Sequence, residues 1–198
     1  MKLFMMILPV ILFCCVFPLA FAEGLQVGFY SSSCGKAESI VQKLVEKRFS
    51  QDKSITAALL RMHFQSCIHR KTSIINPTGC DASVLIDSQN GNQSEKESGA
   101  NWSLRGFDLI DEIKRVLETL CPLTVSCADL IALATRDSIV LAGGQGYNVP
   151  TGRRDGLVSN VDEVSLPGPG LSVTDALQSF NSKGMTPEEM ITLLGAHT

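Results

Sequence analysis

Hydrophobic residues recur at helical spacing along almost the whole chain, and this pattern constrains its fold more than any other feature. The clearest case is an amphipathic stripe that stops at Cys121-Pro122. The stripe consists of Phe107, Ile110, Ile113, Leu117 and Leu120. Segment 126–141 is rich in Ala, Leu and Ile with few charges, so it predicts a buried helix that ends at Gly143-Gly144. We therefore expect an all-α fold.

The same periodicity predicts four further helices. Three of them are marked by apolar residues within 35–50, 55–64 and 173–180. The fourth begins at Thr186-Pro187-Glu188-Glu189. Thr caps the helix, Pro takes the first helical position, and a Glu side chain can accept a hydrogen bond from the backbone N–H of the capping Thr. We expect it to run to about Leu194, with Gly195 as its stop. A short piece near Val84 to Ile86 is the one strand expected.

Composition indicates a single globular domain. The chain has 198 residues, of which 44% are hydrophobic, and this apolar content argues against a disordered chain. Its net charge is -3 and it has no basic stripe, so a nucleic-acid partner is not expected.

The first 22 residues have the pattern of a secretory signal peptide. Lys2 precedes an uncharged run, 3–22, that ends in the small-x-small sequence Ala20-Phe21-Ala22. A membrane anchor is the alternative, because about 20 apolar residues can span a bilayer. Pro9 and Pro18 and the cleavage pattern favour the signal peptide. We therefore expect a secreted chain that begins near residue 23.

The cysteines fit that compartment. Two of the seven lie in the signal region, and the other five are Cys34, Cys67, Cys80, Cys121 and Cys127. Disulfides are expected in an oxidising compartment, and the odd number leaves at least one thiol without an internal partner. Two sequences, Asn92-Gln93-Ser94 and Asn101-Trp102-Ser103, match the N-glycosylation pattern of secreted loops.

Arg61 and Gln65 are the first candidates for chemistry. They lie four residues apart on one predicted helix and so share a face. A guanidinium beside a neutral base is what cleavage of peroxide needs, because the base moves a proton between the two oxygens while the cation stabilises the developing negative charge. Gln65 can orient peroxide but cannot carry the proton. His63 is two residues from each and is interpreted as a buried, hydrogen-bonded core histidine that points away.

The second candidate is His197, in Gly195-Ala196-His197-Thr198. A neutral imidazole just past a helix end can be an axial ligand of haem iron. The alternative is a structural histidine. The other blocks of sequence, described next, favour the iron ligand.

Together these residues resemble the class III plant secretory haem peroxidases, over the whole of 23–198. Several blocks carry the resemblance in the order in which that family has them. They are Gly28-Phe29-Tyr30 with Cys34, Arg61 to Cys67, Gly79 to Leu85, Glu95-Lys96, Leu104 to Phe107, Cys121-Pro122, Val125 to Asp129, Gly152 to Gly156, Leu166 to Pro169 and Gly195 to Thr198.

The resemblance implies a fold and an activity. The fold is the haem-peroxidase helical fold, with the distal half and the start of the proximal half present. The activity is the oxidation of phenolic donors by hydrogen peroxide with haem b. The resemblance also implies a monomer, secreted to the extracellular space or cell wall, with the vacuole as an alternative and no membrane association after signal cleavage.

Site residues follow by position. His197 would be the proximal iron ligand, Arg61 would stabilise the transition state, Asn101 would orient the residue at position 65, and Pro167 would lie at the entrance for aromatic substrates. A distal calcium would be bound by Gly79, Asp81, Ser83 and Glu95, and Thr198 would begin a second calcium site. The disulfides would be Cys34–Cys121 and Cys67–Cys80. Asp129 and Arg153 would form a buried ion pair, with a weak surface pair as the alternative.

The chain departs from the family in four places. Gln65 replaces the distal histidine, and Ser66 replaces a carboxylate ligand of the distal calcium. An insertion near 69–78 separates the distal helix from the calcium loop. Relatives continue beyond Thr198 with the carboxylate that orients the proximal histidine, further ligands of the second calcium and the partner of Cys127. Both calcium sites are thus incomplete, and impaired activity is expected. The alternative is a non-catalytic homologue with weak or no haem binding.

Overall fold

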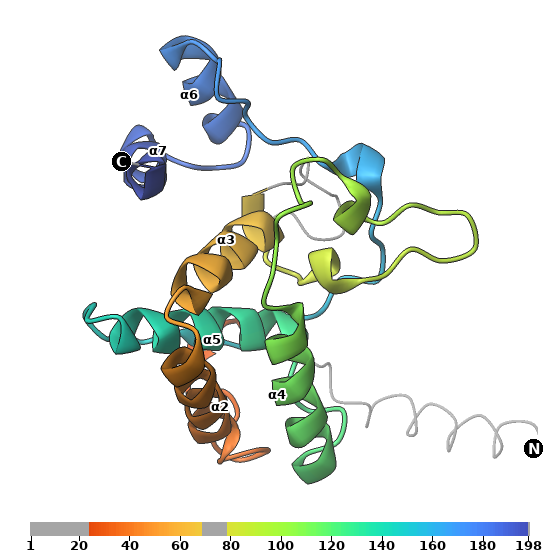
Figure 1. Ribbon diagram of the computed structural model, residues 1–198, viewed down its shortest axis with the longest axis vertical. Helices are drawn as coiled ribbons and strands as arrows, with labels where there is room; N and C mark the ends of the chain where they lie inside the picture. The colour runs from red at the N-terminus through yellow and green to blue at the C-terminus, as the bar shows by residue number, and fades with distance from the viewer. Residues whose placement is uncertain (1–23, 69–78, 198) are drawn as a thin grey trace, which may run out of the picture.

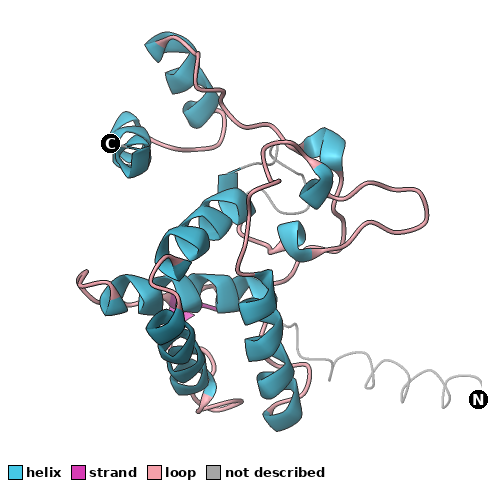
Figure 2. Ribbon diagram, in the orientation of Figure 1, coloured by secondary structure: helices cyan, strands magenta, loops and turns pink. Residues whose placement is uncertain are grey.

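The chain folds almost entirely into helices. The computed structural model describes residues 24–68 and 79–197. Its α-helices are α2 (Ala37–Gln51), α3 (Ile55–Ile68), α4 (Phe107–Leu120), α5 (Cys127–Leu141), α6 (Val173–Asn181) and α7 (Pro187–Leu194) (Figures 1 and 2). The 3-10 turns are η1 (Ser83–Leu85), η2 (Glu95–Glu97), η3 (Val161–Glu163) and η4 (Gly195–His197). The predicted all-α class is confirmed, and the six predicted helices form within a few residues of their expected bounds.

Helix α5 lies at the centre of the domain. Ten of its 15 residues are buried, and α2, α3 and α4 all pack against it (Figure 1). The hydroxyl of Ser126 caps its first turn by accepting a hydrogen bond from Asp129 N at 3.2 Å. A helix that is apolar on all sides must be surrounded by other elements, and this is why segment 126–141 organises the core.

Helix α4 packs one stripe on that core and exposes its other face. Leu109, Ile110, Ile113 and Leu117 are buried. The helix ends where Cys121 forms a disulfide with Cys34, which closes a loop of 87 residues between the N-terminal segment and the end of α4. A second disulfide joins Cys67 to Cys80, and Cys127 is a free cysteine of the described chain.

The predicted strand at Val84–Ile86 is wrong. Ser83–Leu85 form a 3-10 turn instead. The turn begins after Ala82, whose φ of 58° lies in the left-handed region, and it is closed by the Asp81 carboxylate, which accepts a hydrogen bond from Ser83 N at 3.2 Å. These local bonds take up the backbone groups that a strand would have offered to a neighbour.

Two strands form where none was predicted. Strand β1 (Gln26–Val27) pairs antiparallel with β2 (Pro150–Thr151), with Gln26 opposite Thr151. Each strand is only two residues long, so neither can show the alternating pattern by which strands are recognised in a sequence. The pairing ties the start of the described chain to the segment that follows α5.

Helices α6 and α7 form an arm beyond the central helices. Helix α6 packs mainly on α7, and α7 on η4, and Figure 1 shows the pair standing apart from α2, α4 and α5. The predicted capping box of α7 is present, with Thr186 and Glu189 each accepting the other's backbone N–H. Gly195 ends the α-helix but is not a left-handed stop, because its φ is -57° and the chain continues as η4.

Some predictions lie outside the described residues. These are the signal peptide at 1–22, the insertion at 69–78 and the calcium ligand Thr198. Across the part of the chain that is described, no helix has both the length and the apolar character needed to cross a membrane.

Candidate functional site

Arg61 and Gln65 lie one turn apart on α3 and point to the same loop. Arg61 donates from Nη1 to Ser103 Oγ at 2.7 Å and from Nη2 to the carbonyl oxygen of Ala100 at 2.9 Å. Gln65 is buried, and its Nε2 lies 3.5 Å from the same Ala100 oxygen. The shared face predicted from their spacing therefore exists, and the loop at 100–103 fixes both side chains.

Asn101 sits beside this pair. It is buried at 4% exposure, and its Nδ2 donates to the carbonyl oxygen of Glu95 at 2.7 Å. Within the described residues, no group donates a hydrogen bond to its Oδ1. A buried acceptor in that state is costly and is commonly explained by a functional partner. In the sequence, Asn101 directly follows Ala100, the residue whose carbonyl oxygen Arg61 and Gln65 both contact.

His63 faces a different part of the molecule. It is partly buried, and burial, followed by the positive charge of Arg153, lowers its pKa to about 4. The positive charge of Arg153 acts on His63. On α3, His63 is two residues from Arg61, so the two side chains project about 200° apart around the helix. None of the described residues forms a hydrogen bond with His63, so the predicted hydrogen bond of this histidine is not supported. His63 is neutral near pH 7 and takes no place beside Gln65.

The residues expected to bind the distal calcium gather at the end of α3. Asp81, Ser83 and Glu95 are each exposed by 2% or less. Ser83 links them, because its N donates to Asp81 Oδ1 at 3.2 Å and its Oγ donates to Glu95 Oε2 at 3.1 Å. Two carboxylates and a hydroxyl are oxygen donors of the kind that calcium prefers.

Gly79 and Ser66 hold this loop against the helix. A Cβ on Gly79 would lie 2.3 Å from the carbonyl oxygen of Cys67, so only glycine fits there. Cys80 N donates to the Ser66 carbonyl at 2.9 Å, and Ala82 N donates to Ser66 Oγ at 3.0 Å. Ser66 therefore serves as a backbone clamp. In the described chain, no group of three or more His, Cys, Asp or Glu side chains could hold a metal ion.

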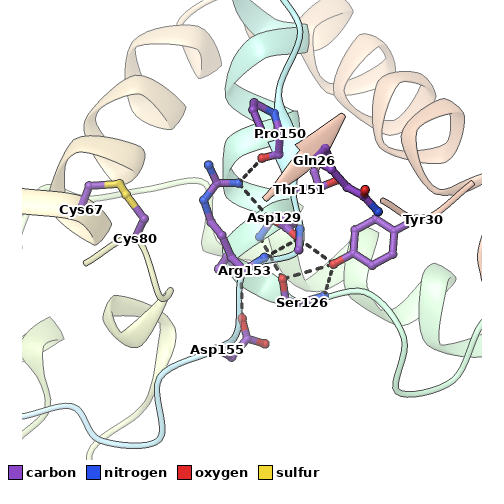
Figure 3. A network of polar contacts seen from close by, with 12 residues as sticks. Gln26, Tyr30, Cys67, Cys80, Ser126, Asp129, Pro150, Thr151, Arg153 and Asp155 are labelled. Carbon is purple, nitrogen blue, oxygen red and sulfur yellow. Dashed lines mark hydrogen bonds and ion pairs between the residues drawn. A yellow bond between two sulfur atoms is a disulfide. The ribbon is translucent and has the colours of Figure 1, made fainter. Parts of the chain in front are cut away.

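A buried polar network lies between α5 and the segment after β2 (Figure 3). Asp129 is fully buried and pairs with Arg153, whose Nη1 lies 2.9 Å from Asp129 Oδ1. Its Oδ2 accepts hydrogen bonds from Gly152 N at 2.7 Å, Arg153 N at 3.1 Å and Tyr30 Oη at 2.6 Å. The predicted buried ion pair is confirmed, and the surface-pair alternative is wrong.

The other contacts of this network were not predicted from the sequence. Burial, with the hydrogen bond to Asp129, raises the pKa of Tyr30 to about 12, so its hydroxyl remains a donor. Asp155 accepts hydrogen bonds from Cys127 N at 2.9 Å and Ala128 N at 2.8 Å at the start of α5. Burial, with the negative charge of Asp155, raises the pKa of the Cys127 thiol to about 11. The one available signal was that these residues fall within the blocks that resemble peroxidases.

The remaining predicted site residues lie on the C-terminal part of the chain. His197 is the last residue of η4, and its side chain is exposed. Pro167 is partly buried in the segment between η3 and α6. Figure 1 shows α7 apart from α3, so the structure brings Arg61, Gln65 and Asn101 together but leaves His197 on the separate arm.

Comparison with known proteins identifies the family of the chain. A family model described as peroxidase matches residues 41–198. The chain belongs to the peroxidase family. It is 57% identical over 183 residues to Peroxidase 57 of Arabidopsis thaliana, an alignment that covers 92% of this chain and 55% of that protein.

Other plant peroxidases are similarly close. Identity is 55% over 184 residues to Peroxidase 44 of Arabidopsis thaliana, covering 93% of this chain and 56% of that protein. It is 51% over 177 residues to Peroxidase 5 of Vitis vinifera, an alignment that covers 88% of this chain and 51% of that protein. The resemblance to class III plant peroxidases is confirmed, and the chain spans about half the length of the curated relatives it matches.

Within the peroxidase family, haem and calcium are general cofactors, and the residues present fit them to different degrees. The exposed imidazole of His197 is accessible to iron, and the arm that carries it presents uncovered apolar residues, with Ile191 66% and Leu194 47% exposed. These features fit a porphyrin. The calcium loop offers Asp81, Ser83 and Glu95, but Ser66 stands where a carboxylate is expected and is already bonded to Ala82. The loop fits a weaker site.

Proposed function

We propose that this chain forms the peroxide-binding half of a secreted haem peroxidase that oxidises small phenolic donors with hydrogen peroxide. The observation that supports this most is the convergence of Arg61 and Gln65 on the Ala100 carbonyl, beside the buried acceptor of Asn101. A cation, a hydrogen-bonding side chain and a positioning amide at one point are what a peroxide site requires.

Haem, when bound, supplies the iron that reduces peroxide and passes oxidising equivalents to donors. His197 would hold it through an imidazole nitrogen. Arg61 donates hydrogen bonds and places its positive charge where negative charge develops as the O–O bond breaks. Gln65 donates from Nε2 and orients peroxide, but its amide has no proton to exchange near neutral pH. The proton must move through solvent, so we propose a slow reaction.

Calcium would support the same site from the end of α3. Asp81, Ser83 and Glu95 supply oxygen ligands, with Gly79 contributing backbone and Thr198 beginning a second site. The disulfide Cys67–Cys80 fixes this loop to the helix that carries Arg61. Calcium would thus act on the orientation of α3 and not on peroxide itself. With Ser66 in place of a carboxylate, the affinity should be lower.

Substrate and location complete the proposal. Pro167 would lie where a phenolic donor approaches. The signal pattern at 1–22 and the two disulfides suit an oxidising compartment outside the cell. The functional form is proposed to be a monomer.

The proposal is tested by removing the cation. The chain is reconstituted with haem, and oxidation of a phenolic donor by peroxide is measured for wild type, Arg61→Leu and Arg105→Leu. Arg105 is a suitable control because it pairs with Asp52 at the surface, at 2.9 Å. We expect Arg61→Leu to lower kcat/KM on the order of 100-fold, as loss of a transition-state donor does. A rate equal to that of free haem, or one unchanged in Arg61→Leu, would refute the proposal.

A non-catalytic homologue is the second candidate, favoured by the exposed His197 on an arm that packs mainly on itself. Haem titration followed by absorption separates the two. Tight binding with a histidine-ligated spectrum that is lost in His197→Ala supports the enzyme. Weak binding that His197→Ala leaves unchanged supports the non-catalytic candidate.

A further inference from the structure

The two N-glycosylation sequences lie in opposite environments. Asn92 is exposed in the loop that projects from the helices between η1 and η2, drawn yellow-green in Figure 1. Asn101 is buried at 4% exposure beside Gln65. A glycan is large and hydrophilic and needs a surface position. Position in the fold therefore distinguishes two sites that the sequence pattern treats as equal.

A tight turn holds Asn92 outward. Gln89 and Asn92 form an antiparallel bridge, with Asn92 N donating to the Gln89 carbonyl at 2.9 Å and Gln89 N donating to the Asn92 carbonyl at 3.3 Å. The two residues between them, Asn90 and Gly91, have φ angles of 52° and 83°. Positive φ at both central positions is the hairpin turn for which Asn-Gly is the preferred sequence.

The base of this loop is fixed to the domain. Ser88 Oγ accepts a hydrogen bond from Ser94 N at 3.0 Å, and Lys96 Nζ pairs with Asp87 at 2.6 Å. Residues 87–93 all remain exposed at the surface. Among the described residues, the side chain of Asn92 makes no hydrogen bond, so its amide nitrogen is available and its modification breaks no contact of the fold.

The side-chain amide of Asn101 already forms a hydrogen bond within the fold. Its Nδ2 donates to the Glu95 carbonyl at 2.7 Å, and its backbone N and O bond to Ser98 and Leu104. A sugar on Nδ2 would collide with the Glu95 backbone and would need space where the side chain is now buried. A chain glycosylated at Asn101 could not close the loop that positions Arg61. Folding and glycosylation are therefore mutually exclusive at this position.

We infer that Asn92 is the N-glycosylation site of this chain and that Asn101 is not modified. In this transfer, Asn92 Nδ2 forms a bond to C1 of the first sugar of a lipid-diphosphate-linked oligosaccharide. The bond from C1 to the diphosphate oxygen breaks, the lipid diphosphate leaves, and Nδ2 loses one proton to a base of the transferase. Ser94 supplies the hydroxyl that the pattern requires, and because Ser94 is 1% exposed in the folded chain, the transfer takes place before this loop closes. The inference goes beyond peroxidase activity and does not depend on it.

The test uses the full chain expressed in a eukaryotic secretory cell. After reduction, trypsin places the two candidates on separate peptides, 72–96 and 97–105, because Lys71, Lys96 and Arg105 are the cleavage points. Release of glycans by peptide N-glycosidase converts each modified Asn to Asp, which mass spectrometry detects. A third Asn-x-Ser/Thr sequence, Asn76-Pro77-Thr78, is excluded by its proline.

We expect conversion at Asn92 and an unmodified 97–105 peptide. The variant Asn92→Gln should lose the glycan, whereas Asn90→Gln, which changes an Asn in the same turn that lacks the required hydroxyl, should keep it. A wild-type product without a glycan overturns the inference, and so does a secreted product with a glycan on Asn101. The glycan is measured by mass, so the result does not depend on haem binding or activity.

Discussion

Arg61 and Gln65 donate to one backbone oxygen, that of Ala100, at 2.9 and 3.5 Å. This shared acceptor fixes the relative position of the guanidinium and of the side chain that stands where peroxidases have a proton carrier. Asn101 follows Ala100 in the same loop, and none of the described residues donates a hydrogen bond to its buried Oδ1. We therefore expect a side chain with a hydrogen-bond donor at position 65 to pair with Asn101 Oδ1.

Replacing Gln65 with histidine should restore proton transfer. An imidazole can donate one N–H to Asn101 Oδ1 and present its other nitrogen to peroxide, so we expect Gln65→His to raise the rate with peroxide on the order of 100- to 10,000-fold. Stopped-flow absorption of the haem-reconstituted chain measures that rate. Gln65→Asn is the control, because it keeps an amide and should show no gain. An equal rate in wild type and Gln65→His would show that position 65 carries no proton.

Breaking the buried pair should destabilise the fold. Arg153→Met leaves the carboxylate of Asp129 buried without its cation. We expect the free energy of unfolding to fall by about 3 kcal/mol. This is the lower end of the range for broken buried ion pairs, because three other hydrogen-bond donors to Asp129 remain. Lys47→Met, which removes an exposed pair with Glu112, should cost at most about 1 kcal/mol. Urea denaturation of each variant measures the difference, and equal losses would contradict a buried role for Arg153.

Asp137 should make stability fall as pH rises. Burial, only partly offset by Arg136, raises the pKa of this carboxyl, and its Oδ2 accepts no hydrogen bond from the described residues. The folded state therefore binds the proton more tightly than the unfolded state. Its contribution is present below the unfolded pKa of about 3.9 and is lost as pH rises through the folded value.

The variant Asp137→Asn removes this dependence, so the difference in unfolding free energy between wild type and variant should decrease from about pH 4 upward. Asp108→Asn is the matched control with the opposite sign. The Arg48 guanidinium lowers the pKa of Asp108, so that contribution is lost as pH falls. Urea titrations across pH measure both. A difference for Asp137→Asn that rises with pH would show that Arg136 outweighs burial.

Gly156 should be needed for the calcium loop. Its N donates to the Asp81 carbonyl at 2.7 Å, and a Cβ would lie 2.5 Å from Asp81 Oδ2. We expect Gly156→Ala to displace this carboxylate, to cost about 1–3 kcal/mol and to weaken stabilisation by added calcium. Gly170→Ala, whose Cβ would meet nothing within 4 Å, is the control. Thermal unfolding with calcium and with a chelator tests this, and identical shifts in both variants would exclude Asp81 as a ligand.

The helices and the candidate residues on α3 were predictable because their signals are local. Apolar spacing and caps are set by neighbours a few residues apart, and this is why α4 and α7 form close to where they were predicted. The strand expected at Val84–Ile86 failed for a local reason as well, since the Asp81 side chain closes a turn that apolar content alone does not reveal. Strands β1 and β2 depend on pairing across more than 120 residues and had no local signal.

By itself, the sequence determined the helical class, the chemistry available at Arg61, Gln65 and His197, and the family to which those residues point. Only the tertiary structure decided that Arg61 and Gln65 donate to the same Ala100 carbonyl and that Tyr30 hydrogen-bonds to Asp129. It also decided that Asn92 is exposed whereas Asn101 is buried. Residue types and spacings are properties of the chain, whereas burial and hydrogen-bond partners exist only once distant segments meet. Burial in turn sets the cost of every unpaired polar group.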